Sequence, residues 1–458
     1  MKTHMFRIIF IVRAFIFLSA FFLITNIYSF AETITLEQVR VLALANSRSL
    51  ARHNLAIMST ILDGRSLLYS NLPSFSLGAS AGMSLWSPAR AAPVDNPLDT
   101  FSAGANISVS QRIFDGGRNA IQRAINNLAT ENARTDALAE YFNVLDAAEN
   151  AYYAVLEAAA TLEAEESALQ NAIASLSIAE IRHAGGMITV GDYLRALAEK
   201  ENRENSRNQA RRALALAKTR LRSLTGLNQI YALEPVDFSR YEELILHLGN
   251  ISDAEADSLY NRFRVLITAG NPSLARAILA KQRSEKNLTL AGRGFSPSIG
   301  ASFSTGINYT PAGGLEMSGG RVSLSASIPV DFWVINNSVE RSRLARDSAA
   351  LDYLSAEIQL DTELQTALLN LFAYAGSVLS SRRSLDFAER HFEYVSERYR
   401  LLQSSVSDHG EASLLLINSR NNHIRVSYGF LQSLSRLRLL EAVDDEERLI
   451  NILLGKQF

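Results

Sequence analysis

Residues 118–184 form a stretch of 67 positions without a glycine or a proline. Proline breaks helix interiors and glycine weakens them, so nothing in this stretch opposes one continuous helix. At 1.5 Å per residue, that helix would be about 100 Å long. Within it, Leu162, Leu169 and Leu176 recur every seven residues, which is the spacing of a coiled-coil seam. The stretch therefore predicts a helix much longer than a small domain is wide.

The same reasoning predicts two helical hairpins. Gly185 and Gly186 end the first long stretch, and a second stretch without breakers follows, so the first hairpin covers 118–226. The second half of the chain repeats this pattern over 335–455, again without proline. There Gly410, in the sequence Ser-Asp-His-Gly, is the expected turn.

Four segments alternate apolar with small polar residues, which is the period of a β-strand. The segments are 74–86, 101–112, 298–309 and 322–330. Apart from Arg112 at the end of the second, they hold no charged residue. A tilted strand of about 9–11 residues spans a membrane with its apolar face toward lipid and its polar face inside a barrel. The uncharged polar faces favour membrane strands over hairpins of a soluble sandwich, which the alternation alone would also allow.

The N-terminus has the features of an export signal. Three cations precede the apolar run 14–24, and Ser29 and Ala31 stand where a signal peptidase requires small residues. The run is short for a transmembrane helix, which needs about 20 residues. We therefore predict a signal peptide over 1–31 and an exported chain.

The composition argues against several function classes. The formal charge is −2, so there is no basic excess to bind the phosphates of a nucleic acid. The chain has no cysteine, which rules out disulfides, thiolate metal sites and a cysteine nucleophile. The seven histidines form no HExxH pair, and the sequence has neither a nucleotide-binding glycine motif nor GxSxG. We therefore expect no enzyme activity, no cofactor and no metal site.

The chain contains an internal duplication. Ser49-Leu50-Ala51-Arg52 recurs 224 positions later as Ser273-Leu274-Ala275-Arg276. We divide the chain into a first repeat, 32–255, and a second, 256–458. Each repeat reads as a helix, two strands and a long helical hairpin, and we expect 227–255 to form an equatorial segment around the hairpins.

Four strands cannot close a barrel, and open sheet edges are not tolerated in lipid. Several chains must therefore contribute strands. Eight strands from two chains leave an interior filled by side chains, whereas twelve strands from three chains begin to leave a passage. The expected fold class is an α+β membrane channel-tunnel, in which a trimeric twelve-stranded β-barrel continues into a tube of coiled-coil helical hairpins.

Three segments resemble a known family in their order and spacing. They are Ile34-Thr35-Leu36-Glu37-Gln38, then Gln111-Arg112-Ile113-Phe114-Asp115-Gly116-Gly117-Arg118, and finally Ala184-Gly185-Gly186-Met187. Together with the duplication they resemble the TolC-like outer membrane efflux protein family over essentially the whole mature chain. The resemblance implies a homotrimer in the outer membrane, with a tunnel that extends into the periplasm.

The resemblance also implies a function and two partners. The chain would be the passive exit duct of a tripartite efflux or type I secretion system. A periplasmic adaptor would dock on it, and an inner-membrane pump would supply the energy. Neither the cargo nor the pump class, ATP-driven or proton-driven, follows from the sequence.

The resemblance places the functional residues at the hairpin tips, where adaptors dock in the family. The residues assigned to adaptor docking are Gly185, Gly186, Met187, Gly191 and Gly410. Asp192 and Arg195 are candidates for a constriction, since rings of charge narrow or select in pores. The alternative is that both are solvated residues beside a turn.

The second tip departs from the family pattern. Arg398-Tyr399 is not followed by a glycine, and an insertion of about one heptad would place Leu415 and Asn418 where the family has acidic residues. We therefore include Leu415 and Asn418 in the candidate constriction. We also expect longer helices at this tip and no gate ringed by carboxylates.

Two other interpretations remain open. An exported coiled-coil structural protein would account for the helices but not for the four strands. A periplasmic adaptor subunit would need only one hairpin, combined with β domains of soluble character. A channel would stay with outer membranes after a salt wash, whereas a soluble coiled coil would not.

Overall fold

The computed structural model describes residues 33–83, 86–87, 92–93, 101–229, 232–311, 313–442 and 445–456. The expected signal peptide and most of the segment between the first two strands lie outside these residues. The chain divides into two compact units. Unit 1 comprises residues up to Asn46, Leu145–Asn250 and Phe372–Ser435, and unit 2 comprises Ser47–Val144, Ile251–Leu371 and Arg436–Phe458.

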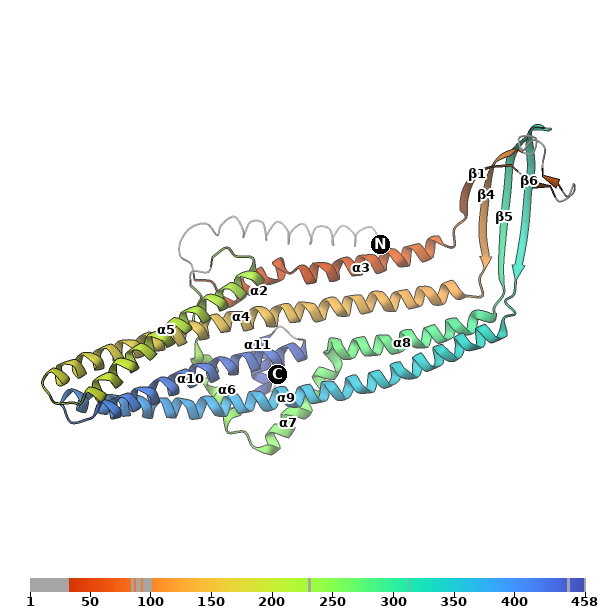
Figure 1. The fold of residues 1–458 in the computed structure, drawn as a ribbon. Coiled ribbons are helices and arrows are strands. Elements are labelled where there is room, and N and C mark those ends of the chain that lie inside the picture. The colour runs from red at the N-terminus through yellow and green to blue at the C-terminus, as the bar shows by residue number, and fades with distance from the viewer. Residues whose placement is uncertain are drawn as a thin grey trace. The chain divides into compact units, whose positions relative to one another are not determined.

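Long helices dominate the structure. In chain order the helices are α2 (Leu36–Asn46), α3 (Arg48–Tyr69), α4 (Arg118–Ala184), α5 (Val190–Thr225), α6 (Glu242–Gly249), α7 (Asp253–Gly270), α8 (Pro272–Gly292), α9 (Phe332–Arg400), α10 (Val406–Glu441) and α11 (Glu446–Leu453) (Figure 1). The stretch without breakers is one uninterrupted helix of 67 residues, α4, and α9 has 69. Among the described helices, none is both long and apolar enough to cross a bilayer.

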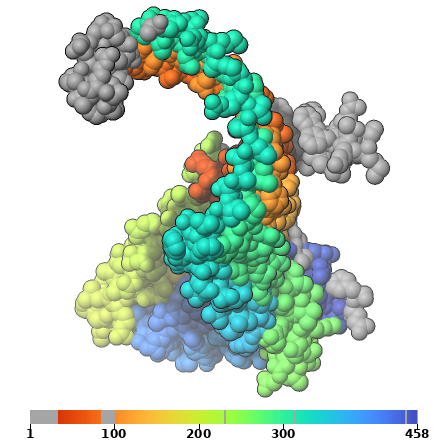
Figure 2. All heavy atoms as spheres, turned by 90° about the vertical axis from the view of Figure 1, so that its right-hand side faces the viewer, coloured from red at the N-terminus to blue at the C-terminus, as the bar shows by residue number. Residues whose placement is uncertain are grey.

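Four strands of unit 2 form one antiparallel sheet in the order β1–β4–β5–β6 (Figure 1). They are β1 (Ser74–Gly82), β4 (Ser102–Phe114), β5 (Ser298–Thr310) and β6 (Gly314–Ser327). A separate pair consists of β2 (Trp86–Ser87) and β3 (Ala92–Pro93). The four long strands curl into an arch (Figure 2).

The last strand differs from the expected 322–330. Its start moves to Gly314, which has a φ of +70° and lies in the tight turn after β5. Gly319 and Gly320 suggest a loop, but here they lie within the strand, where its register against β5 shifts between Ser304 and Gly306. Glycine is tolerated in a strand at such an irregularity.

The strand register brings the alternating residues into common rows. One row across the sheet consists of Phe75, Val109, Phe303 and Val322. The neighbouring row consists of Ser74, Ser110, Ser302 and Ser323. Hydroxyl pairs join the serines at 2.6 Å in β1–β4 and 2.7 Å in β5–β6. Since side chains alternate along every strand, one face of the sheet is apolar and the other is lined by small polar groups.

The apolar face of the sheet is exposed in the single chain. Met317 is 81% exposed, and Leu77 and Val322 are each 79% exposed. A soluble protein rarely leaves a contiguous apolar surface of this kind facing water. The sheet therefore requires an apolar environment on one face and allows a polar one on the other.

The junction between β4 and α4 explains the Asp-Gly-Gly-Arg sequence. Asp115 accepts hydrogen bonds from the backbone N–H groups of Gly117 and Asn119, at 2.9 and 2.7 Å, and so caps the start of α4. Gly116 has a φ of +70°, and a Cβ there would lie 2.2 Å from the Cβ of Ser296. Arg118 donates to carbonyl oxygens just after α8, at 3.0 Å for both Arg293 and Gly294. The motif thus joins the first repeat to the second within unit 2.

In unit 1, a buried ion pair attaches the first helix to the bundle. Arg40 Nε of α2 donates to Glu149 Oε1 of α4 at 2.8 Å, and the Glu149 side chain is 1% exposed. Ser435 of α10 donates to the second carboxylate oxygen at 2.7 Å. A buried charge is tolerated only when it is paired and hydrogen-bonded, and Glu149 meets both conditions.

Candidate functional site

The first hairpin tip, between α4 and α5, lies at the predicted glycines. The Met187 N–H donates to the Arg182 carbonyl at 2.8 Å, and the Gly186 N–H donates to the His183 carbonyl at 2.9 Å. Gly186 has a φ of +69°, the left-handed conformation that ends many helices. Thr189 and Asp192 then form a capping box that starts α5. Gly191 lies in the first turn of that helix.

The second hairpin tip repeats these contacts 216 positions later. The Gln403 N–H donates to the Arg398 carbonyl at 2.8 Å, and the Leu402 N–H donates to the Tyr399 carbonyl at 3.2 Å. Ser405 and Asp408 form the matching capping box, with backbone-to-side-chain distances of 3.0 and 3.1 Å. Here Leu402 occupies the left-handed position, with a φ of +63°.

The assignment of Gly410 to this turn is therefore wrong. Gly410 lies inside α10, which begins at Val406 because the Ser405–Asp408 capping box starts the helix there. One glycine in a helix interior costs only about 0.5–1 kcal/mol, so α10 continues through it. The turn was missed because its left-handed residue is a leucine.

We expect Leu402→Gly to stabilise the second tip by about 1 kcal/mol, because a non-glycine residue is strained in this conformation. Leu402 is 58% exposed, so little packing would be lost. The matched variant is Gly186→Leu, where an added Cβ meets nothing within 4 Å and only the backbone is strained. Thermal unfolding in detergent should move up for the first variant and down for the second. A shift of the same sign in both would contradict this account.

The candidate constriction also changes. The helices after the tips, α5 and α10, both have 36 residues, so the second hairpin carries no heptad inserted relative to the first. At the offset of 216, Asp408 corresponds to Asp192 and Glu411 to Arg195. Leu415 and Asn418, chosen for the inserted register, lie further along α10. The second tip thus has acidic residues at the two positions equivalent to Asp192 and Arg195.

A buried arginine joins the two tips, which lie side by side within unit 1 (Figure 1). Arg182, at the end of α4, is 5% exposed. Its guanidinium lies over the ring of Tyr399, 4.4 Å from the centroid. It donates to the Tyr399 carbonyl and, at 3.2 Å, to the Ser404 carbonyl. The Tyr399 carbonyl lies in the last turn of α9, and the Ser404 carbonyl lies just before α10. The Arg182 guanidinium of the first tip therefore caps the end of α9 at the second tip.

Tyr399 is the centre of this contact. It is 1% exposed, and its hydroxyl donates to the Ser175 carbonyl of α4 at 3.2 Å. The His409 ring stacks on it at 4.7 Å and lies 3.3 Å from the Ser396 hydroxyl. Burial, together with the nearby Arg400 guanidinium, lowers the pKa of His409, against an opposing effect of Glu199. The imidazole is therefore neutral at neutral pH, which suits its place in an apolar stack.

Charged residues of both tips line one small cavity of about 320 Å³. Arg195 and Glu199 come from α5, and Glu411 comes from α10. Asp192 and Asp408 act differently, since their carboxylates cap helices. Hydrogen bonds from Ser405 hold the pKa of Asp408 below its usual value, so that it stays ionised. Arg195 and Glu411 are both exposed and stand at equivalent positions of the two tips.

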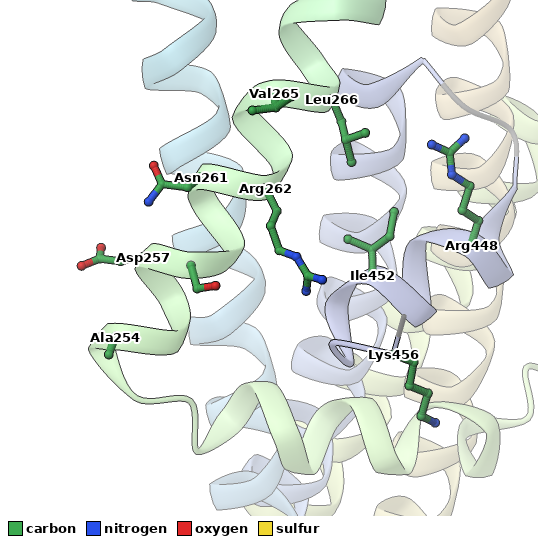
Figure 3. Close-up of a pocket in the computed structure, with 10 residues that line it drawn as sticks. Ala254, Asp257, Asn261, Arg262, Val265, Leu266, Arg448, Ile452 and Lys456 are labelled. Atoms are coloured by element: carbon green, nitrogen blue, oxygen red, sulfur yellow. The ribbon is translucent and has the colours of Figure 1, made fainter. Parts of the chain in front are cut away.

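A second cavity, of about 970 Å³, lies in unit 2 between α7 and α11. Arg262 extends from α7 toward Ile452 of α11, whereas Asp257 points away from α11 (Figure 3). Arg448 and Lys456 lie on the α11 side. The described residues contain no cluster that could hold a metal ion.

Comparison with known proteins agrees with this architecture. The CmeC outer membrane channel of Campylobacter jejuni has a similar structure, with a TM-score of 0.73 at 16% identity over 92% of this chain and 90% of that chain. VceC of Vibrio cholerae gives 0.70 at 16% identity, over 89% and 96%. The open state of the MtrE channel of Neisseria gonorrhoeae gives 0.62 at 15% identity, over 89% and 88%. At these identities the likeness shows the fold.

The sequence comparisons are of two kinds. No curated protein matches the chain. The sequence profile of the outer membrane efflux protein family matches residues 39–227 and 265–441, one segment in each repeat. These segments contain both hairpin tips and cover most of the chain. The chain belongs to the outer membrane efflux protein family.

Proposed function

We propose that this efflux channel is the outer-membrane exit duct of a tripartite efflux or type I secretion system. The family consists of channels rather than enzymes, and the structurally similar CmeC and MtrE are outer membrane channels. In the proposal, three copies form a passive duct across the outer membrane and into the periplasm. An inner-membrane pump supplies the energy, and a periplasmic adaptor joins the pump to the hairpin tips.

The four-stranded sheet is the observation that carries this proposal. Its edges are β1 and β6, which run in opposite directions because all three pairings between them are antiparallel. The β6 strand of one copy can therefore pair antiparallel with β1 of the next. Three copies give twelve strands, an even number with the apolar face outside and the serine-lined face inside.

The hairpin tips support the adaptor contact. Gly185, Gly186, Met187 and Gly191 surround a turn in which Met187 is 67% exposed. Residues 401–405 replace Gly410 as the equivalent surface of the second tip. Two similar tips per chain would present six similar surfaces on a trimer, a repeated target for a ring of adaptor copies.

The same tips support a constriction at the closed end of the duct. Arg195 and Glu411 occupy equivalent positions, so a trimer would carry three of each. They would alternate around the passage as a ring of mixed charge. A ring of uniform charge from Asp192 is less favoured, because that carboxylate is bound to Thr189 in the cap.

Purified protein should be tested for its mass in detergent and for single-channel conductance in planar bilayers. A trimer that conducts is the expected result. A monomer that never inserts would overturn the duct and favour an exported coiled coil. A periplasmic adaptor subunit would also fail to insert, and would be released from membranes by a salt wash.

Replacing the two tip charges should change ion selectivity in opposite directions. Glu411→Ala removes three negative charges from the trimer and should favour anions, whereas Arg195→Ala should favour cations. A unit charge about 4 Å from an ion in water contributes about 1 kcal/mol, so the permeability ratio should shift up to about fivefold. Reversal potentials across a KCl gradient measure this ratio. Conducting trimers with unchanged selectivity in both variants would remove these residues from the passage.

A further inference from the structure

One contact between the repeats is made inside the chain. Within unit 2, Arg276 of α8 lies 3.5 Å from Asp136 of α4, Nη1 to Oδ1. Nearer the sheet, Arg118 of α4 donates to the carbonyls that follow α8. Within the chain, the two repeats are thus joined by contacts between α4 of the first repeat and α8 of the second. The converse contact, α9 of the second repeat against α3 of a first repeat, has no counterpart among the described contacts of the chain.

The duplication shows which residues correspond. The first helices, α3 and α8, match at an offset of 224, since they begin at Arg48 and Pro272 after the capping residues Ser47 and Asn271. The long helices α4 and α9 match at an offset of 216, which the two hairpin tips share. These two offsets allow any contact between α4 and α8 to be transferred to α9 and α3.

When the two offsets are applied to the Arg276–Asp136 ion pair, the equivalent residues carry the same charges. Arg276 corresponds to Arg52 on α3, and Asp136 corresponds to Asp352 on α9. Arg52 and Asp352 are both exposed. Within the described part of the chain, the structure gives neither residue an ion-pair partner. Arg52 and Asp352 thus occupy the positions equivalent to Arg276 and Asp136, but they do not form an ion pair with each other within the described chain.

The same two helices carry exposed apolar stripes with a spacing of seven. On α3 the stripe consists of Leu55, Leu62 and Tyr69, which are 65%, 58% and 63% exposed. On α9 it consists of Leu344, Leu351 and Ile358, which are 69%, 64% and 68% exposed. Residues this apolar and this exposed on a coiled-coil spacing indicate a missing partner helix.

The stripes face away from the neighbours that α3 and α9 already have. The Thr60 carbonyl of α3 accepts from Asn126 of α4 at 2.9 Å, and Lys281 of α8 lies 5.3 Å from the Tyr353 ring centroid on α9. Thr60 is two positions from Leu62, and Tyr353 is two positions from Leu351. Two positions turn a helix by about 200°, so each stripe lies opposite the existing contact.

We propose that α9 of one copy packs against α3 of the next copy, with Asp352 paired to Arg52 across the interface and the two apolar stripes buried between the helices. The partner is a second copy of this chain. The order of the sheet agrees, because β1 follows α3, β6 precedes α9, and both strands are free edges. The inference rests on the proposed trimer and adds the helix pair and the charges that set its register.

Cysteine cross-linking in outer membranes tests the pairing, since the chain has no cysteine of its own. Full-length Arg52→Cys/Asp352→Cys protein should give linked dimers and trimers with a short bis-maleimide on a denaturing gel. The matched control is Asp136→Cys/Arg276→Cys, which occupies the internal position. The control should lose its free thiols to the reagent and still migrate as a monomer.

Charge exchange provides a second measurement. Arg52→Asp or Asp352→Arg alone should weaken the trimer, and the double exchange should restore it. An exposed ion pair contributes about 0.2–1 kcal/mol, so three interfaces should change the assembly constant by about 3- to 100-fold. Trimer dissociation followed by mass in detergent gives the change. A double exchange that restores nothing would overturn the ion pair.

The failures of the two proposals are distinguishable. A conducting trimer whose 52/352 cysteine pair gives no intermolecular product, while the control pair reacts, would overturn this interface and keep the duct. A chain that stays monomeric and does not conduct would overturn both.

Discussion

An arginine in place of Ile107 should prevent stable insertion of the protein, whereas an arginine in place of Ser108 should not. The two residues are neighbours in β4 and point to opposite faces of the sheet. Ile107 shares its face with Leu77, directly opposite on β1, whereas Ser108 lies opposite Ser76 and Ser304. An arginine on the lipid face costs about 2–4 kcal/mol near the bilayer midplane, and a trimer incurs this cost three times.

The measurement is the fraction of protein that remains with outer membranes after a carbonate wash. We expect Ile107→Arg in the soluble or aggregated fraction and Ser108→Arg in the membrane fraction, with an altered conductance. Equal loss of both variants would indicate a general folding defect. Loss of Ser108→Arg alone would reverse the assignment of the two faces.

The long helices and the four strands of the sheet were predictable because each depends on local pattern. The 67 residues of α4 contain nothing that ends a helix, and the strands alternate apolar with small polar residues on either side of the register shift in β6. The start of β6 was not predictable in this way. Glu316 and Arg321 interrupt the uncharged pattern, yet both lie on the polar face, opposite Asn308 and Ser304, where a barrel interior tolerates charge.

The two tips show where local pattern is insufficient. Gly186 marks the first turn because glycine adopts a positive φ without strain. Leu402 adopts the same conformation, and no residue preference points to it. The offset of 216 would have located the second turn, since it aligns Asp192 with Asp408. That comparison would also have made Glu411, the equivalent of Arg195, a candidate for the constriction.

The contact between Arg182 and Tyr399 could not be predicted from either repeat alone. The two residues are 217 positions apart, and they meet only because the two hairpins pack together. Nothing in the sequence around Arg182 distinguishes it from the many exposed arginines of the long helices. Its significance comes from its burial and from the carbonyl groups that it contacts.

Replacing Arg182 with alanine should loosen the closed tips and raise the conductance of the duct. The change would leave the carbonyls of Tyr399 and Ser404 without their donor and would remove the cation from the face of the Tyr399 ring. Hydrogen bonds from charged groups contribute about 1.5–3 kcal/mol each. A loss of about 3 kcal/mol would shift the equilibrium between closed and separated tips by about a hundredfold.

The matched control is Arg398→Ala, since Arg398 stands at the equivalent position of the second tip. That residue is exposed and donates at 3.1 Å to the Gln403 carbonyl within its own turn. Its loss should therefore leave single-channel conductance nearly unchanged. Arg182→Lys keeps the charge but loses the planar fork that reaches two carbonyls, so an intermediate conductance is expected. Folded Arg182→Ala trimers with the conductance of the unmodified protein would show that closure does not depend on this contact, and would leave the mixed charges of Arg195 and Glu411 as the remaining candidates for the barrier.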